Sequence, residues 1–332
     1  MRILTAADQQ RVVTMPEAME AVTHALIEYS AGRADSPVRT AIPVPGSGGT
    51  SLFMPALVEQ AGGLGVKFVS VFPRNRELGK RTIFGTVILA NVETAEPYAL
   101  LEASYLTALR TGAAAGLSAK LLARNDAHTI GLIGAGAQAP MQLRGVLGVR
   151  PIREVRLFDR HPDQAYRLAQ EMSEEFAHRH IRFVVCLTPE DTVRGVDIII
   201  TATSSLSPVF PIELVQPGMH IIAIGSFRPG MQELPPGVIS PSAKVVVESR
   251  EAALEESGDL VIPIRDGLFR PEDIYAELGE LASGKKPGRE RPEEVTVFKS
   301  VGLAVMDMVV GKAVYDKAVE KGLGTEVDLF AT

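Results

Sequence analysis

Cysteine is almost absent from this sequence: Cys186 is the single thiol among 332 residues. One thiol cannot close a disulfide within the chain, and such scarcity is typical of proteins from a reducing compartment. Cys186 lies in the apolar run RFVVCL, which predicts a buried strand in which the thiol acts as a small hydrophobe. The six histidines have no metal-ligand spacing, so we expect no metal site.

Long runs of one charge or of apolar residues are also missing. The formal net charge is −6, and no long run of lysine or arginine could neutralise a phosphate backbone, which argues against nucleic-acid binding. The start, MRILTAADQQ, lacks the apolar core of a signal peptide, and no apolar run approaches the ~20 residues that a membrane span needs. We therefore expect a cytoplasmic protein without a membrane partner.

The length favours two domains, and the first third of the chain has its own pattern. Apolar spacing predicts an amphipathic helix over 15–34, and proline and glycine between apolar runs predict a hairpin over 39–58. Two more strands are expected at 63–72 and 84–92, followed by an Ala/Leu-rich helix over 104–123. These segments predict a mixed sheet backed by a helix.

From about residue 126 strands and helices alternate regularly, and the strands are almost continuously apolar. This pattern is typical of a parallel sheet covered on both faces, an α/β fold of the doubly wound Rossmann type. Residues 295–322 read as one long apolar helix after a short loop, and such a helix could return to the first domain. We expect a first, discontinuous domain of residues 1–118 plus 303–332 and a second domain of residues 119–302.

A glycine-marked turn follows the first of these strands in the stretch TIGLIGAGAQA. Gly134 permits a tight turn, and Gly136 lets the backbone approach a pyrophosphate. Small Ala139 takes the place of the third glycine, where a helix packs closely on the strand. The residues expected to bind the dinucleotide phosphates are Gly134, Gly136, Ala137 and Gln138.

An acidic residue stands where the ribose of a dinucleotide would lie. Asp159 ends the next strand and could hold the ribose hydroxyls, and its charge would repel a 2′-phosphate, so NAD(H) is preferred. Arg160 follows directly and keeps NADP(H) possible, since a guanidinium can meet a phosphate. The alternative is a turn that only forms the fold, with Asp159 capping the next helix.

Three cations lie in apolar settings in the first domain: Arg39, Lys67 and Arg110. A lysine inside the strand GVKFVSV loses hydration, and burial lowers its pKa toward the range useful for proton transfer. Arg110 could grip a carboxylate with its planar fork. The alternatives are an exposed edge-strand lysine and a surface arginine.

Together these residues resemble the ornithine cyclodeaminase and mu-crystallin family. The resemblance covers nearly the whole chain, and its most specific motifs are LTALRT, GAGAQA and FKSVG. It implies a Rossmann domain inserted into a discontinuous α+β domain for dimerisation and substrate binding, and a homodimer. Members include cyclodeaminases, an archaeal-type alanine dehydrogenase and reductases of cyclic ketimines such as pyrroline-2-carboxylate.

The resemblance also assigns roles to individual residues. It implies that Arg39, Lys67 and Arg110 hold a substrate carboxylate near the nicotinamide, with Lys67 as the proton carrier. Arg110 is also expected to contact the cofactor. The other positions expected near the cofactor are Thr82, Thr111, Thr203, Ser226 and Ser300, and Val301 is expected near the cofactor and the substrate.

One departure from the family pattern bears on the reaction. Cyclodeaminases carry an aspartate in a run like G-A-D-x-P-G-K-x-E-L, whereas this chain has GSFRPGMQEL, with Phe227 for the aspartate and Met231 for the lysine. Phenylalanine cannot act as a general acid or base, so the resemblance argues against ornithine cyclodeamination unless another carboxylate reaches the site. Phe227 would instead offer an apolar wall to a substrate ring.

The sequence thus predicts an NAD(P)H-dependent reductase of small carboxylated imines, of the pyrroline-2-carboxylate type. Three alternatives stay open: ornithine cyclodeaminase, an alanine-type amino-acid dehydrogenase, and a mu-crystallin-like binder without catalysis. The expected partner of the enzyme is a small amino-acid or imino-acid substrate.

Overall fold

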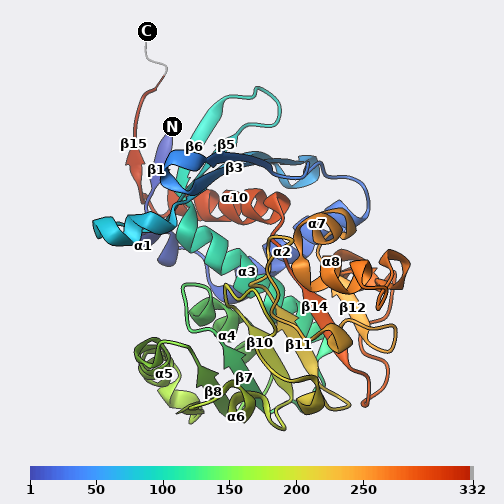
Figure 1. Ribbon diagram of the computed structural model, residues 1–332. Coiled ribbons are helices and arrows are strands. Elements are labelled where there is room, and N and C mark those ends of the chain that lie inside the picture. The colour runs from blue at the N-terminus through green and yellow to red at the C-terminus, as the bar shows by residue number, and fades with distance from the viewer. Residues whose placement is uncertain (330–332) are drawn as a thin grey trace. The chain divides into compact units, whose positions relative to one another are not determined.

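The structure is a computed structural model that describes residues 1–329 (Figure 1). The chain forms two compact units: unit 1 comprises Met1–Arg110 and the segment from Leu303 onward, and unit 2 comprises Thr111–Gly302. The division falls inside helix α3, Ala103–Leu122. The sequence placed it after residue 118, within the same helix. The α/β class expected from the sequence is confirmed.

Unit 1 contains a seven-stranded sheet in which, among the described residues, only β1 and β6 pair in parallel. Its strands, in spatial order, are β15 (Thr325–Glu326), β1 (Arg2–Leu4), β6 (Pro97–Glu102), β5 (Ile83–Ala90), β4 (Gly63–Val71), β3 (Gly49–Val58) and β2 (Thr40–Val44). The mixed sheet agrees with the expectation, although β1, β6 and β15 were not anticipated. These strands are short or lie outside the regular apolar pattern.

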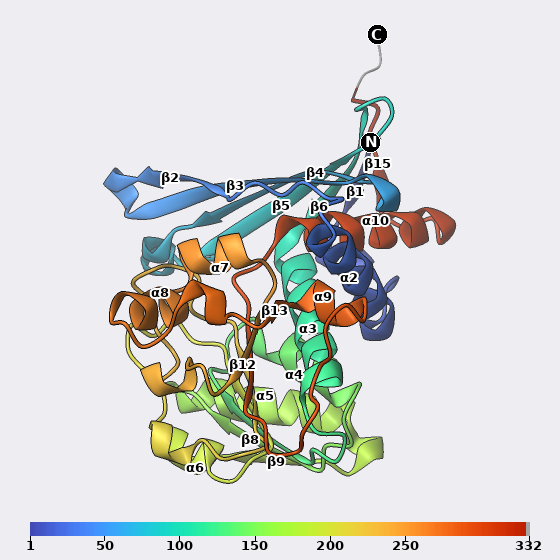
Figure 2. The ribbon, with the colours of Figure 1, turned by 90° about the vertical axis from the view of Figure 1, so that its right-hand side faces the viewer.

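Helices α2 (Met15–Ser30) and α10 (Ala304–Glu320) pack against each other on one face of this sheet, and α10 contacts β3, β4 and β5 (Figure 2). A short helix α1, Ala6–Gln10, precedes them. The prediction of a single helix over 295–322 was wrong. Residues Thr296–Lys299 form strand β14, because the run TVFK is β-branched and aromatic, and α10 begins only after Gly302 turns the chain at φ 88.

The sheet of unit 1 has one face covered by helices and one open face. Met54, Lys67 and Val87 lie opposite one another on β3, β4 and β5, and all three are buried. Phe53 and Phe68, their neighbours in the chain, are paired on the other face with ring centroids 5.1 Å apart and are exposed. Because side chains alternate along a strand, the pleat sends Lys67 toward the face covered by α10.

Unit 2 contains an eight-stranded sheet whose pairings are all parallel. Its strands, in spatial order, are β13 (Ala276–Glu277), β12 (Lys244–Val247), β14, β11 (His220–Ala223), β10 (Ile198–Thr201), β7 (Thr129–Ile133), β8 (Glu154–Phe158) and β9 (Arg182–Val185). Its helices are α4 (Ala139–Leu147), α5 (Pro162–Glu175), α6 (Pro189–Val193), α7 (Arg250–Glu256), α8 (Gly258–Arg265) and α9 (Leu278–Ala282). The chain order reverses between β7 and β10, which is where doubly wound sheets bind ligands.

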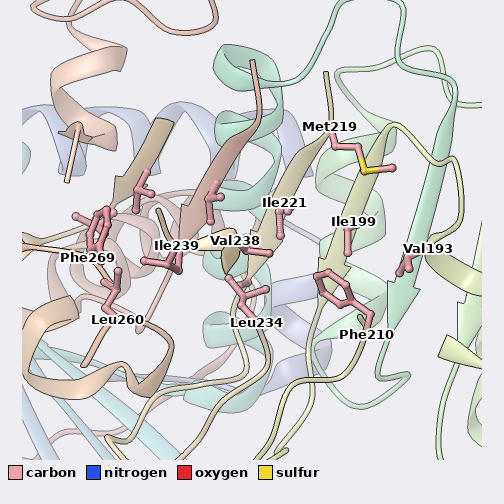
Figure 3. Packing of buried hydrophobic residues seen from close by; sticks show 14 of the residues in the cluster. Val193, Ile199, Phe210, Met219, Ile221, Leu234, Val238, Ile239, Leu260 and Phe269 are labelled. Carbon is pink, nitrogen blue, oxygen red and sulfur yellow. The ribbon is translucent and has the colours of Figure 1, made fainter. Parts of the chain in front are cut away.

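The core of unit 2 explains its nearly continuous apolar strands. Ile199 of β10 and Ile221 of β11 pack with Val238, Leu260 and other buried side chains on one face of the sheet (Figure 3). Such packing requires apolar side chains on strands that are covered on both faces.

The expectation for Cys186 was partly wrong. It follows the end of β9 and is half-buried, because the edge strand stops at Val185.

Across residues 1–329, no helix is both long enough and apolar enough for a bilayer span.

Candidate functional site

Lys67 is the central cation of unit 1. It lies in the middle of β4 and is only 3% exposed, so the alternative of a surface lysine is wrong. A buried ammonium loses its hydration, which is unfavourable unless a counter-charge replaces the water. Lys67 therefore requires a buried partner of negative charge.

The partner is Asp307, on the face of α10 that meets the sheet. Its Oδ2 accepts a hydrogen bond from Lys67 Nζ at 2.6 Å, and its Oδ1 accepts one from Arg110 Nε at 3.3 Å. Arg110 is 4% exposed and Asp307 is fully buried. The structure thus brings two of the three predicted cations of unit 1 onto one carboxylate that the sequence reasoning missed.

The charges in this cluster compete. Burial lowers the pKa of Lys67 to about 8, opposed by Asp307 and assisted by the positive charges of Arg110 and Arg39. Burial alone would raise the pKa of the Asp307 carboxyl, but Arg110 and Lys67 hold it below its ordinary value. Lys67 is therefore a group that can exchange a proton near neutral pH, whereas Asp307 stays an anion.

Arg39 and Thr82 are the other two predicted residues of unit 1. Arg39 is half-buried just before β2, and its positive charge acts on Lys67. Thr82 precedes β5, is half-buried, and its carbonyl accepts a hydrogen bond from Phe72 N at 2.7 Å. Their expected contacts with substrate and cofactor stay predictions.

In unit 2, the glycine turn lies at the carboxyl end of β7, at the reversal of strand order. Gly134 has φ 98, and a Cβ there would lie 2.6 Å from Ala202 O, so this position requires glycine. A Cβ at Gly136 would meet no atom within 4 Å, so the space beside its backbone is open. An open backbone surface followed directly by the start of α4 fits a pyrophosphate.

Asp159 supports this turn from the end of β8. Its Oδ2 accepts a hydrogen bond from Ala135 N at 2.8 Å, and its Oδ1 accepts one from His161 N at 2.7 Å. The N-cap residue of α5 is His161, so the alternative of Asp159 as a plain helix cap is wrong. Each carboxylate oxygen retains capacity for another donor, such as a ribose hydroxyl. Arg160 beside it is exposed.

The other cofactor and substrate candidates of unit 2 follow the carboxyl ends of neighbouring parallel strands. Thr203 follows β10, Ser226 and Phe227 follow β11, and Ser300 and Val301 follow β14. Because the strands are parallel, these ends meet at the same edge of the sheet as the glycine turn. This edge is the position at which a dinucleotide binds in such folds.

The two serines among these residues already have internal partners. The hydroxyl of Ser226 donates to Met231 O at 2.7 Å, and that of Ser300 donates to Glu248 Oε1 at 2.7 Å. Both serines are buried. Phe227 is half-buried, with the guanidinium of Arg228 5.5 Å from its ring centroid.

Two further predicted residues are buried. Val301 is 7% exposed beside Ser300, and Thr111 is 6% exposed on α3, where it is the first residue of unit 2. Gln138 is the N-cap residue of α4, the helix that follows the glycine turn.

Glu233 organises this edge and was missed by the sequence reasoning. Its carboxylate is fully buried and accepts hydrogen bonds from Thr203 N, from Thr203 Oγ1 and from Thr201 Oγ1 at 2.6, 2.8 and 2.9 Å. It also accepts one from Gly225 N at 2.6 Å, which joins the ends of β10 and β11. Burial and the neighbouring Asp259 raise its pKa, while Lys299 opposes this shift.

A hollow of about 480 Å³ opens beside the glycine turn, also within unit 2. It is lined by residues of the turn, of α4 and of α5: Ala135, Gly136, Ala137, Pro140, Gln164, Arg167, Leu168 and Glu171. Arg167 and Glu171 place one positive and one negative side chain at its wall.

The two missed carboxylates differ in how visible they are in the sequence. Asp307 stands in the run AVMDMVV, and a lone acid in an apolar helix is a signal for a buried counter-charge. Glu233 stands in MQEL among loop residues, where a surface acid is the ordinary expectation.

Comparisons with known proteins agree with this geometry. The chain matches the Ornithine cyclodeaminase/mu-crystallin family over residues 1–322. It is 47% identical over 328 residues to a Delta(1)-pyrroline-2-carboxylate reductase of Bacillus cereus, covering 99% of this chain and 100% of the relative.

Solved structures show the same fold. A Delta(1)-pyrroline-2-carboxylate reductase of Thermococcus litoralis, in complex with NADH and L-proline, superposes with a TM-score of 0.94 at 38% identity, over 98% of this chain and 100% of that one. An archaeal alanine dehydrogenase dimer with bound NAD gives a TM-score of 0.90 at 36% identity, over 99% of both chains. The chain therefore belongs to the ornithine cyclodeaminase/mu-crystallin family.

Proposed function

We propose that this protein is an NAD(P)H-dependent reductase of small carboxylated cyclic imines, of the Delta(1)-pyrroline-2-carboxylate type. The observation that carries the proposal is the buried cluster of Lys67, Asp307 and Arg110, which combines a proton donor with an anchor for a carboxylate. The similar reductases from Bacillus cereus and Thermococcus litoralis support the same substrate class.

The side chains of unit 1 match the chemical needs of such a substrate. Arg110 and Arg39 supply positive charge for its carboxylate, and a hydrogen bond from a guanidinium to a carboxylate is charge-assisted and therefore strong. Fixing the carboxylate orients the adjacent C=N bond. Lys67 donates a proton from Nζ to the imine nitrogen, which makes the carbon a better hydride acceptor.

The cofactor assigned to unit 2 is NAD(H). When bound, the reduced nicotinamide supplies the hydride that the imine carbon accepts. Gly134, Gly136, Ala137 and Gln138 would hold the pyrophosphate at the start of α4, and Asp159 would hold the ribose hydroxyls. Asp159 favours NAD(H) over NADP(H), because its negative charge repels a 2′-phosphate.

Amine elimination has less support in this chain. Phe227 stands at the position of the cyclodeaminase aspartate and cannot carry a proton. Asp307 is a second carboxylate that could be considered, but both of its oxygens accept hydrogen bonds and its pKa is held low by Arg110 and Lys67. It is therefore a poor general acid.

A homodimer is the proposed assembly, with unit 1 as the dimerisation domain. The open face of its sheet carries an apolar patch, formed by Ile42, Val44, Phe53, Phe68, Phe84 and Ile88, each at least 36% exposed. Clusters of exposed apolar side chains of this kind mark protein interfaces. The dimer of the similar archaeal alanine dehydrogenase supports a second copy of this chain as the partner. The cytoplasmic location stays a prediction.

The function is tested by assaying the purified protein with pyrroline-2-carboxylate and piperideine-2-carboxylate, using NADH and NADPH. We expect loss of reduced nicotinamide with at least one imine, and formation of proline or pipecolate. Ornithine with NAD⁺, and pyruvate with ammonia and NADH, serve as the competing substrates. Ammonia from ornithine, or turnover of pyruvate without turnover of either imine, would overturn the proposal.

A further inference from the structure

Asp307 accepts three hydrogen bonds in a fully buried position. Besides Lys67 Nζ at 2.6 Å and Arg110 Nε at 3.3 Å, its Oδ1 accepts one from Thr107 Oγ1 at 3.5 Å. Thr107 and Arg110 lie on α3, Lys67 on β4 and Asp307 on α10. The carboxylate therefore joins three elements of unit 1 at one point.

Such an ion pair is not needed for packing. A buried pair recovers little more than its desolvation penalty, so apolar side chains of similar volume would serve the core as well. The neighbours of Asp307 on α10, Met306 and Met308, are fully buried apolar residues of this kind. The carboxylate of Asp307, placed between two such methionines, therefore indicates an electrostatic role toward Lys67 and Arg110.

The groups that face Lys67 act on its charge in opposite directions. Asp307 of α10 favours the ammonium, whereas Arg110 of α3 and Arg39 before β2 disfavour it. Burial also disfavours the ammonium. Without the carboxylate, every remaining influence on Lys67 favours the neutral amine, which has no acidic proton to give.

Arg110 has a second feature that depends on Asp307. Its Nε is bonded to the carboxylate, whereas its buried Nη1 has no hydrogen-bond partner among residues 1–329. A buried guanidinium N–H without a partner is costly, so it indicates an anionic or carbonyl ligand that is bound during function. Asp307 thus fixes one edge of the guanidinium and leaves another donor for a ligand.

We propose that Asp307 is a positioning residue that keeps Lys67 protonated and holds the Arg110 guanidinium with a free donor for the substrate carboxylate. This inference rests on the proposed imine reduction. In that step an Nζ–H bond of Lys67 breaks and an N–H bond forms at the imine nitrogen, while the carbon takes the hydride supplied by NADH. Lys67 is left as a neutral amine and regains its proton from water, and Asp307 remains an anion throughout.

The first test compares pH profiles of kcat/KM for imine reduction. In Asp307→Asn we expect the loss of activity on the alkaline side to begin at least one pH unit lower, so that the variant is far more impaired at pH 9 than at pH 6. Asp307→Glu retains the charge and should return the profile toward that of the wild type. Asp316→Asn removes an acid paired with Lys312 on the exposed side of α10 and should leave the profile unchanged.

A purely structural role predicts a different result. If Asp307→Asn lowers kcat/KM by the same factor at every pH, or lowers NADH affinity to the same extent as kcat/KM, the proposal is overturned. NADH affinity is measured by fluorescence titration. It reports on the cofactor residues, which belong to unit 2, whereas Asp307 belongs to unit 1.

The second test needs no turnover. Lysine Cε NMR signals are titrated in the free protein, and the Lys67 signal is assigned by its loss in Lys67→Met. We expect the Lys67 titration in Asp307→Asn to move to lower pH than in the wild type. An unchanged Lys67 titration contradicts the proposal.

If neither Asp307 variant folds, NMR titration of the wild-type protein still tests the proposal. The Cγ signal of Asp307 should move in the same pH step as the Cε signal of Lys67, and independent titrations would overturn the proposal. If the wild type reduces no imine, the proposed function fails, while the NMR titrations still report on the pairing.

Discussion

Lys67 Nζ and Asp307 Oδ2 lie 2.6 Å apart although 240 residues separate them in the chain. The strand β4 sends Lys67 to the covered face of the sheet, and α10 places Asp307 on that same face. Burial in this position lowers the pKa of Lys67 to about 8, while the charge of Asp307 opposes that shift.

Imine reduction should depend on the ammonium form of Lys67. We expect kcat/KM for pyrroline-2-carboxylate to fall as the pH rises through about 8, because burial has lowered the pKa of Lys67 to that value. Lys67→Met should reduce kcat/KM by ~10²–10⁴-fold, the usual contribution of a general acid. NADH affinity should be unchanged, and Lys312→Met, at a surface position of α10, serves as the control. Full activity of Lys67→Met would exclude this role.

The two glycines of the turn should respond differently to alanine. Gly136→Ala should leave thermal stability unchanged, because the added Cβ meets no atom within 4 Å, yet weaken NADH binding by ~10-fold or more, as the Cβ occupies the approach of the pyrophosphate. Gly134→Ala should lower stability itself, because the Cβ would lie 2.6 Å from Ala202 O at φ 98. Thermal melts and fluorescence titrations separate the two effects. Unchanged NADH affinity in Gly136→Ala would argue against a pyrophosphate at the turn.

Asp159 should set the choice between the two nicotinamide cofactors. In Asp159→Ser the repulsion of a 2′-phosphate is lost, along with a charged acceptor for the ribose, so the preference for NADH over NADPH should fall by ~10-fold or more, the effect of 1–2 kcal/mol. Dissociation constants for both cofactors measure this ratio. Asp163→Ser, in the exposed first turn of α5, is the control. Equal weakening of both cofactors would instead indicate that Asp159 only supports the turn.

His220 should make unit 2 sensitive to acid. Burial and Arg289 lower the pKa of His220 to about 3, from an ordinary value of 6.5. Below pH 6.5 the unfolded chain binds a proton here that the folded chain does not, so the free energy of unfolding should fall by ~1.4 kcal/mol per pH unit toward pH 3.

The variant for comparison is His220→Gln. The free energy of unfolding of both proteins is measured by urea denaturation, monitored by circular dichroism, between pH 7 and pH 4. The imidazole contacts Thr296 Oγ1 at 2.9 Å and Ser118 Oγ at 3.3 Å, so a neutral amide is the matched replacement. The variant should lose less stability than the wild type over this pH range. Parallel losses in the two proteins would show that other groups cause the acid sensitivity.

The open face of the unit 1 sheet should control assembly. Phe68→Glu places a carboxylate beside Phe53 in the apolar patch, so it should convert a dimer into a monomer of 35.6 kDa. Light scattering coupled to gel filtration gives the mass. Leu187→Glu makes the same chemical change at a residue that is 87% exposed in unit 2, and it should leave the mass unchanged. A wild-type mass equal to one chain would refute the dimer.

The sequence by itself determined the parts of this protein that depend on local patterns. The turn at Gly134 and Gly136 was visible because a strand, two glycines and a helix follow one another directly, and the motifs around Lys67 and Arg110 indicated the family. Periodicity also predicted the mixed sheet and the parallel sheet. It failed over residues 295–322, because a short apolar strand and the start of a helix have similar composition, and only pairing with β11 and β12 makes Thr296–Lys299 a strand.

The tertiary structure alone decided which charges meet. Register between β3, β4 and β5 determines that Lys67 faces α10, and the packing of α10 supplies Asp307 as its partner. The same holds for Glu233, whose loop folds back onto the ends of β10 and β11. Pairings of this kind arise between segments far apart in the chain, so no local pattern encodes them, and the low-dielectric interior in which they meet exists only after the chain has folded.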